Sequence, residues 1–366
     1  MLLLVLYVGL VYGAALIAAL LATGPRWRRG AAVLLVAAGY AVPFLAPTGD
    51  PTFRAFVALG SLWFTARTVE LLREPKPVPT SRRIWHVLGL VDTLRARRMT
   101  PRVDTSALIR LLVCAPLVAA GWAGVSFGSY LPSGAARLAV RWSAGVVLVY
   151  TGVETVVALV ILLYGLLGVD PRPLHDDPIR SRTITEFWSR RWNRAVHRFL
   201  KQTVFAPVAR RGRTGLGLVL TFLMSAFIHF AFMLPAVGLF WAGMMGAFFV
   251  LQLPFLWAER ALGVNRWPGL LARAWTLGLL LVSSPLFVEP ALQIVDSWSA
   301  PRSSQSLTRR LSPSQRDPQL PSSDAEDRRV VIEAEGTKAE SWGSFTLKVW
   351  NDDRTRSLII SGVTFP

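Results

Sequence analysis

Long apolar runs fill most of the chain up to Phe287, and they constrain the fold more than any other feature of the sequence. A helix that crosses a bilayer needs about 20 mostly apolar residues. The runs that we interpret as spans are Leu2–Thr23, Ala31–Leu45, Phe53–Leu72, Ala107–Phe127, Arg137–Leu167, Gly215–Leu234, Ala236–Trp257 and Leu270–Phe287. Charged residues make up 17% of the 366 residues, whereas a soluble domain carries about 25%. We therefore predict an all-α polytopic membrane protein with about eight transmembrane helices.

Two details of these runs refine that prediction. No Lys or Arg precedes the first run and it contains no small-residue cleavage site, so we expect a retained helix rather than a signal peptide. The fifth run is long enough for one tilted helix or for two pieces broken near Gly152. Cys114, the single cysteine, lies within a predicted span, so neither an intrachain disulfide nor a cysteine-based metal site is expected.

The formal charge of +18 comes mainly from three loops between the predicted spans. Arginines follow span one at Arg26, Arg28 and Arg29. Basic residues follow span three at Arg73, Lys76, Arg82, Arg83, Arg95, Arg97, Arg98 and Arg102, and span five between positions 172 and 213. With eight spans these loops share one side of the membrane, and the positive-inside rule makes that side cytoplasmic and both termini external. The charge is thus explained by topology and by anionic membrane lipids as partners, and a nucleic-acid partner is not expected.

Two of the basic loops are predicted to contain helices. Ser81–Arg98 has apolar residues along one side and arginines around them, which is typical of an interfacial amphipathic helix. Thr183 followed three residues later by Glu186 is a capping box and predicts the start of a second helix. Along that helix a polar edge is expected, formed by Glu186, Arg190, Asn193 and His197.

The composition changes near the end of the last apolar run. We predict a membrane-embedded domain over residues 1–298 and a disordered linker over 299–329, which is rich in Ser, Pro and Arg. Residues 330–366 form a short C-terminal tail with alternating runs that indicate a few β-strands. No chemistry is assigned to this small disordered or β tail.

His229 is the first candidate for chemistry, because ionisable residues are rare inside membrane spans and often functional. It either hydrogen-bonds a neighbouring helix or acts as a general base, since burial favours the neutral imidazole. Asn193 is either a surface polar residue or an amide that polarises a reacting group. Glu154 lies inside the fifth span, and we expect it to pair with Arg141 or to face a wet cavity.

The other histidines suggest no further centre. His197 belongs to the polar edge, and His86 and His175 are interpreted as loop residues. The four histidines lack metal-ligand spacing, and the chain contains neither a Gly-rich phosphate loop nor a nucleophile elbow. We therefore expect no bound metal and no cofactor.

The residues from Phe187 to Asn193, Phe-Trp-Ser-Arg-Arg-Trp-Asn, resemble the Phe-Trp-Gly-Arg-Arg-Trp-(Asn/His) signature of plant-type wax synthases, a branch of the membrane-bound O-acyltransferases. They are also similar to the Phe-Tyr-x-Asp-Trp-Trp-Asn motif of the diacylglycerol and sterol acyltransferases. In that branch Val-His follows the motif, as Val196 and His197 do here. The segment from Ser225 to His229 resembles the wax-synthase Ser-Gly-x-x-His element that carries the catalytic histidine. The likeness is strong over residues 178–232. Ser189 and Ala226 replace the usual glycines, and Arg190 stands where the sterol-type enzymes have Asp, which favours the wax-synthase branch.

This resemblance implies transmembrane helices that enclose a tunnel, with acyl-CoA as co-substrate and a lipophilic alcohol as acceptor. A fatty alcohol is the expectation, and a diacylglycerol, a sterol or another lipophilic hydroxyl compound also suits an apolar tunnel. By position, His229 deprotonates the acceptor and Asn193 orients or polarises the reacting groups. The residues expected to bind substrate are Trp188, Arg190, Arg191, Trp192, Arg194, His197, Arg198 and Ser225.

Two other classes of function are compatible with a polytopic membrane protein that contains buried His and Glu residues. A transporter or lipid-handling protein would use the buried His and Glu as a proton relay, but such proteins often contain inverted repeats and broken helices, which the sequence does not suggest. A purely structural membrane protein is the third reading. The abundance of Ala, Arg, Val and Leu indicates a GC-rich bacterial genome and hence a bacterial plasma membrane.

Overall fold

The computed structural model describes residues 2–46, 48–170, 173–299, 331–339, 342–350 and 357–364. The chain divides into two units, Met1–Ala300 and Pro301–Pro366, which are described separately. The predicted linker falls outside the described residues except for its first residue, so it stays a prediction.

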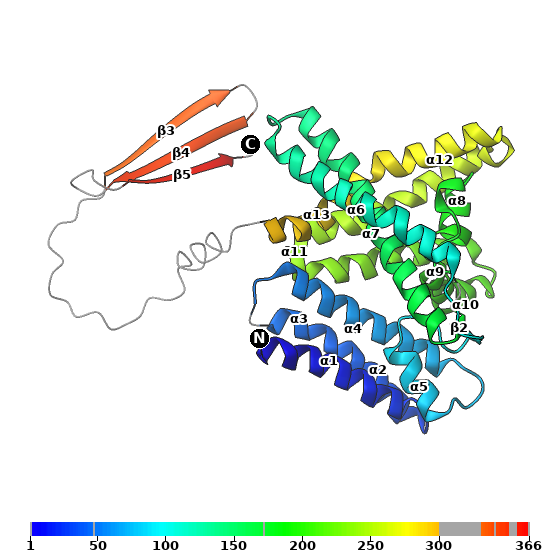
Figure 1. The fold of residues 1–366 in the computed structure, drawn as a ribbon. Coiled ribbons are helices and arrows are strands. Elements are labelled where there is room, and N and C mark those ends of the chain that lie inside the picture. The colour runs from blue at the N-terminus through cyan, green and yellow to red at the C-terminus, as the bar shows by residue number, and fades with distance from the viewer. Residues whose placement is uncertain are drawn as a thin grey trace, which may run out of the picture. The chain divides into compact units, whose positions relative to one another are not determined.

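The first unit is built from helices joined by mostly short connections (Figure 1). Its longer helices, of nine residues or more, are α1 (Leu2–Leu21), α2 (Arg26–Ala38), α4 (Pro51–Leu72), α5 (Thr80–Leu88), α6 (Thr105–Tyr130), α7 (Ala135–Leu166), α11 (Thr214–Ala261), α12 (Gly269–Ser283) and α13 (Pro285–Ser299). The shorter helical pieces are η1 (Gly39–Ala41), α3 (Val42–Leu45), η2 (Pro178–Arg180), α8 (Ile184–Glu186), η3 (Phe187–Arg191), α9 (Arg194–Leu200), η4 (Lys201–Phe205), α10 (Ala206–Ala209) and η5 (Val264–Arg266). Two short strands, β1 (Arg97–Arg98) and β2 (Val169–Asp170), pair antiparallel.

Helix α11 has 48 residues and contains a sharp reversal at Gly238. Gly238 has φ 81° and ψ 178°, a backbone conformation that is essentially restricted to glycine. Beyond this point the second half packs back on the first, because a Cβ at Gly246 would lie 3.4 Å from the carbonyl oxygen of Ala226. Twenty residues of straight helix would separate these positions by about 30 Å. Helix α11 is therefore a helical hairpin whose two arms are each long enough to cross a membrane.

The described residues contain six helices with the length and apolar character of membrane spans, and a seventh candidate formed by the bent pair α12 and α13. These two helices meet at an angle of 48° around Ser284. If the arms of α11 are counted separately, the arrangement is consistent with the eight expected spans. The chain is thus a multi-pass integral membrane protein.

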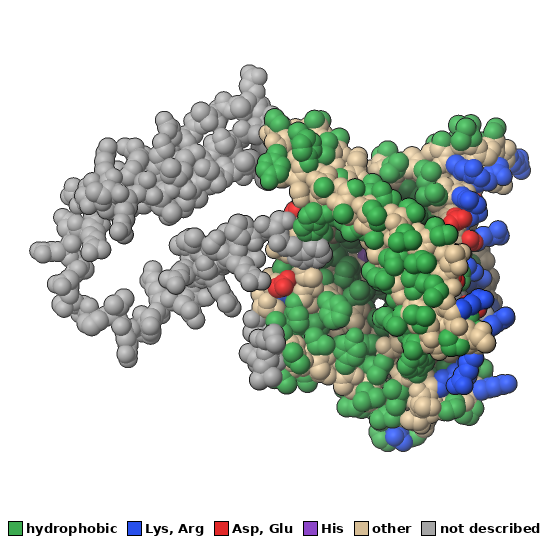
Figure 2. Space-filling model, in the orientation of Figure 1, with side chains coloured by type: hydrophobic (Ala, Val, Ile, Leu, Met, Phe, Trp, Pro, Cys, Tyr) green, Lys and Arg blue, Asp and Glu red, His purple; other side chains and the backbone are tan. Residues whose placement is uncertain are grey.

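The three basic loops lie on the same side of the first unit, as predicted. The Arg29 guanidinium donates to the carbonyl of Leu72, which links the first loop to the end of α4. The Arg73 guanidinium donates to the carbonyl of Gln202 at 2.6 Å, which links the second loop to the third. Figure 2 shows Lys and Arg gathered along one edge of the molecule, over the region that carries α5, α9 and α10 in Figure 1.

The amphipathic helix expected over Ser81–Arg98 is shorter than predicted, because α5 ends at Leu88. Gly89 follows in an extended conformation, with ψ 150°, and the chain then turns into a loop that leads to β1. Val87 packs into the apolar core formed by α1, α2 and α4, so this helix is part of the bundle.

Within the second unit, the described residues form three strands. They are β3 (Val331–Ala339), β4 (Trp342–Trp350) and β5 (Ser357–Thr364). They pair antiparallel in the order β3-β4-β5, with Val331 opposite Trp350 and Trp350 opposite Ser357.

Candidate active site

The segment after Thr183 begins as the capping box predicts and then departs from the predicted helix. The Thr183 hydroxyl accepts from the backbone N–H of Glu186 at 2.9 Å, and the Glu186 carboxylate accepts from the N–H of Arg182 at 2.8 Å. The chain continues as one π-helical turn, η3, which closes where the N–H of Trp192 donates to the carbonyl of Phe187. The single continuous helix with one polar edge, expected from Glu186 to His197, is therefore wrong.

The break falls at Asn193, which has a left-handed backbone with φ 39° and ψ 61°. Among non-glycine residues, Asn and Asp adopt this conformation most readily. The Asn193 Oδ1 atom accepts from the N–H of Val196 at 3.2 Å and so caps the new helix α9. Because Oδ1 serves as the cap, the hydrogen-bond donors that the Asn193 side chain can offer to a bound molecule are its two amide N–H groups.

The signature segment is anchored to the second arm of α11 by two side chains that the sequence analysis did not single out. Glu259, which is buried, accepts from the N–H of Ile184 and from the hydroxyl of Thr185 at 2.9 Å. Gln252, also buried, accepts from the indole N–H of Trp188 at 3.3 Å. A carboxylate at the end of an apolar run was the available sequence signal for Glu259.

We expect Glu259→Ala to destabilise the protein, because the N–H of Ile184 and the hydroxyl of Thr185 lose their acceptor. Leaving a buried donor unsatisfied costs about 1–3 kcal/mol. The melting temperature in detergent should fall clearly for Glu259→Ala and less for Glu259→Gln, which keeps one acceptor oxygen. Equal melting temperatures for wild type and Glu259→Ala would show that this anchor is unimportant.

A cavity of about 460 Å³ lies between the signature segment and the arms of α11. Its walls come from α8 to η4 on one side and from both arms of α11 on the other. The lining residues are Thr185, Trp188, Ser189, Arg190, Trp192, Asn193, Val196, His197, Leu200, Lys201, Phe205, Leu218, Thr221, Phe222, Ser225, His229, Phe249, Leu256 and Arg260. The structure thus brings His229 and Asn193, which are 36 positions apart in the sequence, into one cavity.

His229 is held in a defined orientation within this cavity. Its Nδ1 atom lies 2.8 Å from the carbonyl oxygen of Ser225, one helical turn earlier. A carbonyl only accepts, so the neutral ring carries its proton on Nδ1 and leaves the Nε2 lone pair free. The ring also stacks on Phe249 from the second arm, with centroids 3.9 Å apart and planes at 28°. A fixed imidazole with an unprotonated Nε2 has the form that a general base requires.

Five of the eight residues expected to bind substrate line the cavity: Trp188, Arg190, Trp192, His197 and Ser225. Arg191, Arg194 and Arg198 are all described and lie outside its lining. The Arg191 Nε atom instead pairs with Glu186 at 2.7 Å. Arg260, in the last turn of α11, also lines the cavity, although this end of the helix is distant in sequence from the signature.

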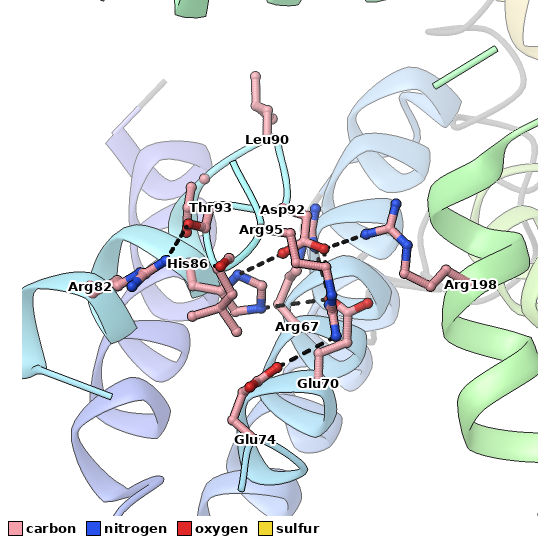
Figure 3. A network of polar contacts seen from close by, with 12 residues as sticks. Arg67, Glu70, Glu74, Arg82, His86, Leu90, Asp92, Thr93, Arg95 and Arg198 are labelled. Atoms are coloured by element: carbon pink, nitrogen blue, oxygen red, sulfur yellow. Dashed lines mark hydrogen bonds and ion pairs between the residues drawn. The ribbon is translucent and has the colours of Figure 1, made fainter. Parts of the chain in front are cut away.

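Arg198, which is outside the cavity lining, pairs with Asp92 in a polar network (Figure 3). His86, interpreted from the sequence as a loop residue, is fully buried in this network on α5. Its ring lies between two carboxylates, 3.6 Å from Glu70 and 3.9 Å from Asp92. Burial alone would raise the pKa of Asp92, but Arg95 together with His86 and Arg67 lowers it, and the pKa is lowered overall. This ionised cluster connects the N-terminal helices to the wall of the cavity.

The expected pairing of Glu154 with Arg141 is wrong. Arg141 instead binds Glu289 at 2.9 Å and Asp296 at 2.7 Å on α13. Glu154 lies 2.8 Å from both Arg110 and His175. The sequence does not reveal these partners, because they come from α6 and from the connection after α7.

His197 lines the cavity on α9, outside the membrane spans, and its pKa is lowered by burial and by the nearby cations Lys201 and Arg198. When the pH is below 6.5, the ordinary pKa of histidine, His197 binds a proton in the unfolded chain but not in the folded chain. Stability is therefore expected to fall as pH drops from about 6.5 towards the lower folded pKa. Thermal unfolding of wild type and His197→Gln between about pH 7.5 and pH 5 checks this, and the variant should lose less stability on acidification. Parallel pH profiles would contradict the prediction.

Comparison with known proteins gives a consistent result over this region. Residues 129–269 match the model of the membrane-bound O-acyltransferase family. In Arabidopsis thaliana, "Probable long-chain-alcohol O-fatty-acyltransferase 2" is 36% identical over 90 residues, covering 22% of this chain and 26% of that protein. "Probable long-chain-alcohol O-fatty-acyltransferase 1" is 32% identical over 103 residues, covering 28% and 25%. "Probable long-chain-alcohol O-fatty-acyltransferase 7" is 27% identical over 148 residues, covering 37% and 44%.

The matched stretches thus span a quarter to less than half of these relatives' lengths. The family match includes the signature segment and both arms of α11, so it contains every residue that lines the cavity. The resemblance predicted from the sequence is confirmed for this part of the chain.

Proposed function

We propose that this chain, similar over residues 129–269 to the membrane-bound O-acyltransferases, is an acyl-CoA-dependent O-acyltransferase that esterifies a lipophilic alcohol. One observation carries the proposal. An imidazole with a free Nε2 atom and an amide with free N–H donors share one cavity, which supplies a base and a polarising group for acyl transfer.

The reaction needs one proton to move twice. Nε2 of His229 takes the proton from the acceptor hydroxyl, and the hydroxyl oxygen attacks the carbonyl carbon of the thioester. The amide of Asn193 donates to the oxygen on which negative charge develops. The carbon–sulfur bond then breaks, and the protonated imidazole returns the proton to the CoA thiolate, which leaves ester and CoA as products.

The cavity lining suits the two parts of an acyl-CoA. Arg190, Lys201 and Arg260 provide cations for the phosphate groups of CoA. Apolar side chains around His229, including Phe222, Phe249 and Leu256, suit the acyl chain. The proposal of acyl-CoA as the donor rests on this match of charge and polarity.

The acceptor is proposed to be a long-chain alcohol that enters from the surrounding lipid. The names of the Arabidopsis proteins specify this acceptor class for those relatives. The location in a bacterial plasma membrane, inferred from the composition, remains a prediction.

The test is an assay of the purified protein in lipid vesicles with a long-chain acyl-CoA and a long-chain alcohol. Ester should appear together with an equal amount of free CoA, measured by mass spectrometry and by thiol release. Folded protein that forms no ester with any long-chain acyl-CoA and alcohol pair would overturn the proposal and favour the transporter reading.

A further inference from the structure

The connection between β2 and η2 lies directly behind the signature segment. The backbone N–H of Arg194 donates to the carbonyl of Leu174 at 2.8 Å, and the N–H of Asp176 donates to the carbonyl of Arg191 at 2.9 Å. His175 lies between these two contacts. They bracket the dipeptide Trp192–Asn193, whose side chains both line the cavity, so the connection clamps the point where the helix breaks.

The side chain of His175 adds a second contact to the same dipeptide. Its ring is stacked on the indole of Trp192, with centroids 4.4 Å apart and planes at 16°. Phe187 and Tyr150 also lie nearly parallel to this indole, at 5.6 Å and 6.0 Å. The orientation of Trp192 is therefore set by rings from three different parts of the chain.

His175 is in turn held by charged residues of the membrane helices. Its Nδ1 atom lies 2.8 Å from Glu154 Oε1 on α7, and the second oxygen of Glu154 accepts from Arg110 on α6 at 2.8 Å. His175 and Glu154 are each 2% exposed. Placing Glu154 and His175 away from water is costly unless they are paired, and Arg110, which is 32% exposed at its side chain, supplies the pairing cation.

None of these three residues lines the cavity, although all are among the described residues. Their connection to the cavity runs through the ring of Trp192, on which His175 stacks, and through the backbone hydrogen bonds on both sides of Trp192–Asn193. We infer that Arg110, Glu154 and His175 are positioning residues, which act through Trp192 to hold the amide of Asn193 in place for acyl transfer. This inference rests on the proposed function.

The backbone of Asn193 explains why such support is needed. Asn193 has a positive φ of 39°, and a left-handed conformation in a residue other than glycine is strained and persists where the surroundings impose it. A misplacement of about 1 Å in a reacting group can lower the rate about 100-fold. By fixing Trp192, the His175 ring can therefore affect the position of Asn193 and, through it, kcat.

The first variant is Glu154→Gln, which keeps the shape of the side chain and removes its charge. Its matched control is Glu289→Gln, which removes the same charge from the partly buried pair with Arg141. This pair is distant in sequence from the signature and outside the cavity lining. We expect kcat to fall about tenfold for Glu154→Gln, with KM for acyl-CoA and for alcohol nearly unchanged. For Glu289→Gln we expect a kcat close to that of wild type.

A double variant distinguishes positioning from general destabilisation. If Glu154 acts through Asn193, adding Glu154→Gln to Asn193→Asp should cause little further loss, because the group being positioned is already changed. Independent effects would instead multiply. His175→Phe provides a second variant that keeps an aromatic ring on Trp192 and removes the pairing, and it should behave as Glu154→Gln does.

The outcomes separate the two proposals. Wild-type protein without esterification would overturn the proposed function itself. An active wild type in which Glu154→Gln and His175→Phe match the Glu289→Gln control, or in which the losses with Asn193→Asp multiply, would overturn the positioning role alone. Melting temperatures in detergent, measured for each variant, identify any loss that comes from unfolding.

Discussion

Replacing His229 with alanine is expected to reduce ester formation by about 100-fold to 10,000-fold, the range that a general base contributes. The variant loses the imidazole that lines the cavity, and the only hydrogen bond described for this ring, from Nδ1 to the Ser225 carbonyl, is made within one helix. The fold should therefore persist while turnover disappears. Initial rates of ester and CoA release, at saturating acyl-CoA and alcohol, measure the effect.

Phe227→Ala is the matched control for this variant. Phe227 lies two positions before His229 on the same arm of α11, and 59% of its side chain is exposed, away from the cavity lining. It should retain the turnover of wild type. Turnover in His229→Ala that equals that of Phe227→Ala would remove His229 from the mechanism.

Asn193→Asp is expected to lower kcat by about 100-fold, the typical effect of losing one oxyanion donor. Aspartate keeps an oxygen that can cap α9 and tolerates the left-handed backbone, so the local fold is preserved. It cannot donate from its side chain, and its negative charge opposes the charge that develops on the substrate. KM for acyl-CoA and kcat, determined separately, show whether the loss occurs in the chemical step.

Asn193→Ala should be at least as impaired in turnover and should also be less stable. It loses the cap, which costs about 1 kcal/mol, and it tolerates a positive φ poorly. The comparison assigns the role of the residue. If Asn193→Asp is fully active and Asn193→Ala is not, Asn193 serves only to shape the start of α9.

The membrane architecture was predictable because it depends on properties that are local in the sequence. Each span needs about 20 apolar residues, and each connection is marked by its charge. Even the division of α11 into two arms was expected, since Gly215–Leu234 and Ala236–Trp257 were read as separate runs. Gly238 then supplies the one backbone conformation that lets the chain reverse.

The helix break at Asn193 was not predictable from periodicity. The apolar spacing around Trp188 and Trp192 fits a continuous helix, and the capping box at Thr183 supports one. The break is held by two backbone hydrogen bonds, one accepted by the carbonyl of Leu174 and one donated by the N–H of Asp176. Both residues follow α7, and these contacts exist only after the chain has folded. The same reason explains why His86 and His175 looked like loop residues although both are buried.

The amino-acid sequence alone was sufficient to identify the spans, the side on which the cations lie, and the two groups, His229 and Asn193, proposed for catalysis. Which arginines line the cavity required the folded chain: Arg191 and Arg198 pair with Glu186 and Asp92, while Arg260 reaches the cavity from the end of α11. The physical reason is range. Hydrophobic length and charge are summed along neighbouring residues, whereas the direction of a side chain and its partner depend on contacts between segments that are far apart in the chain.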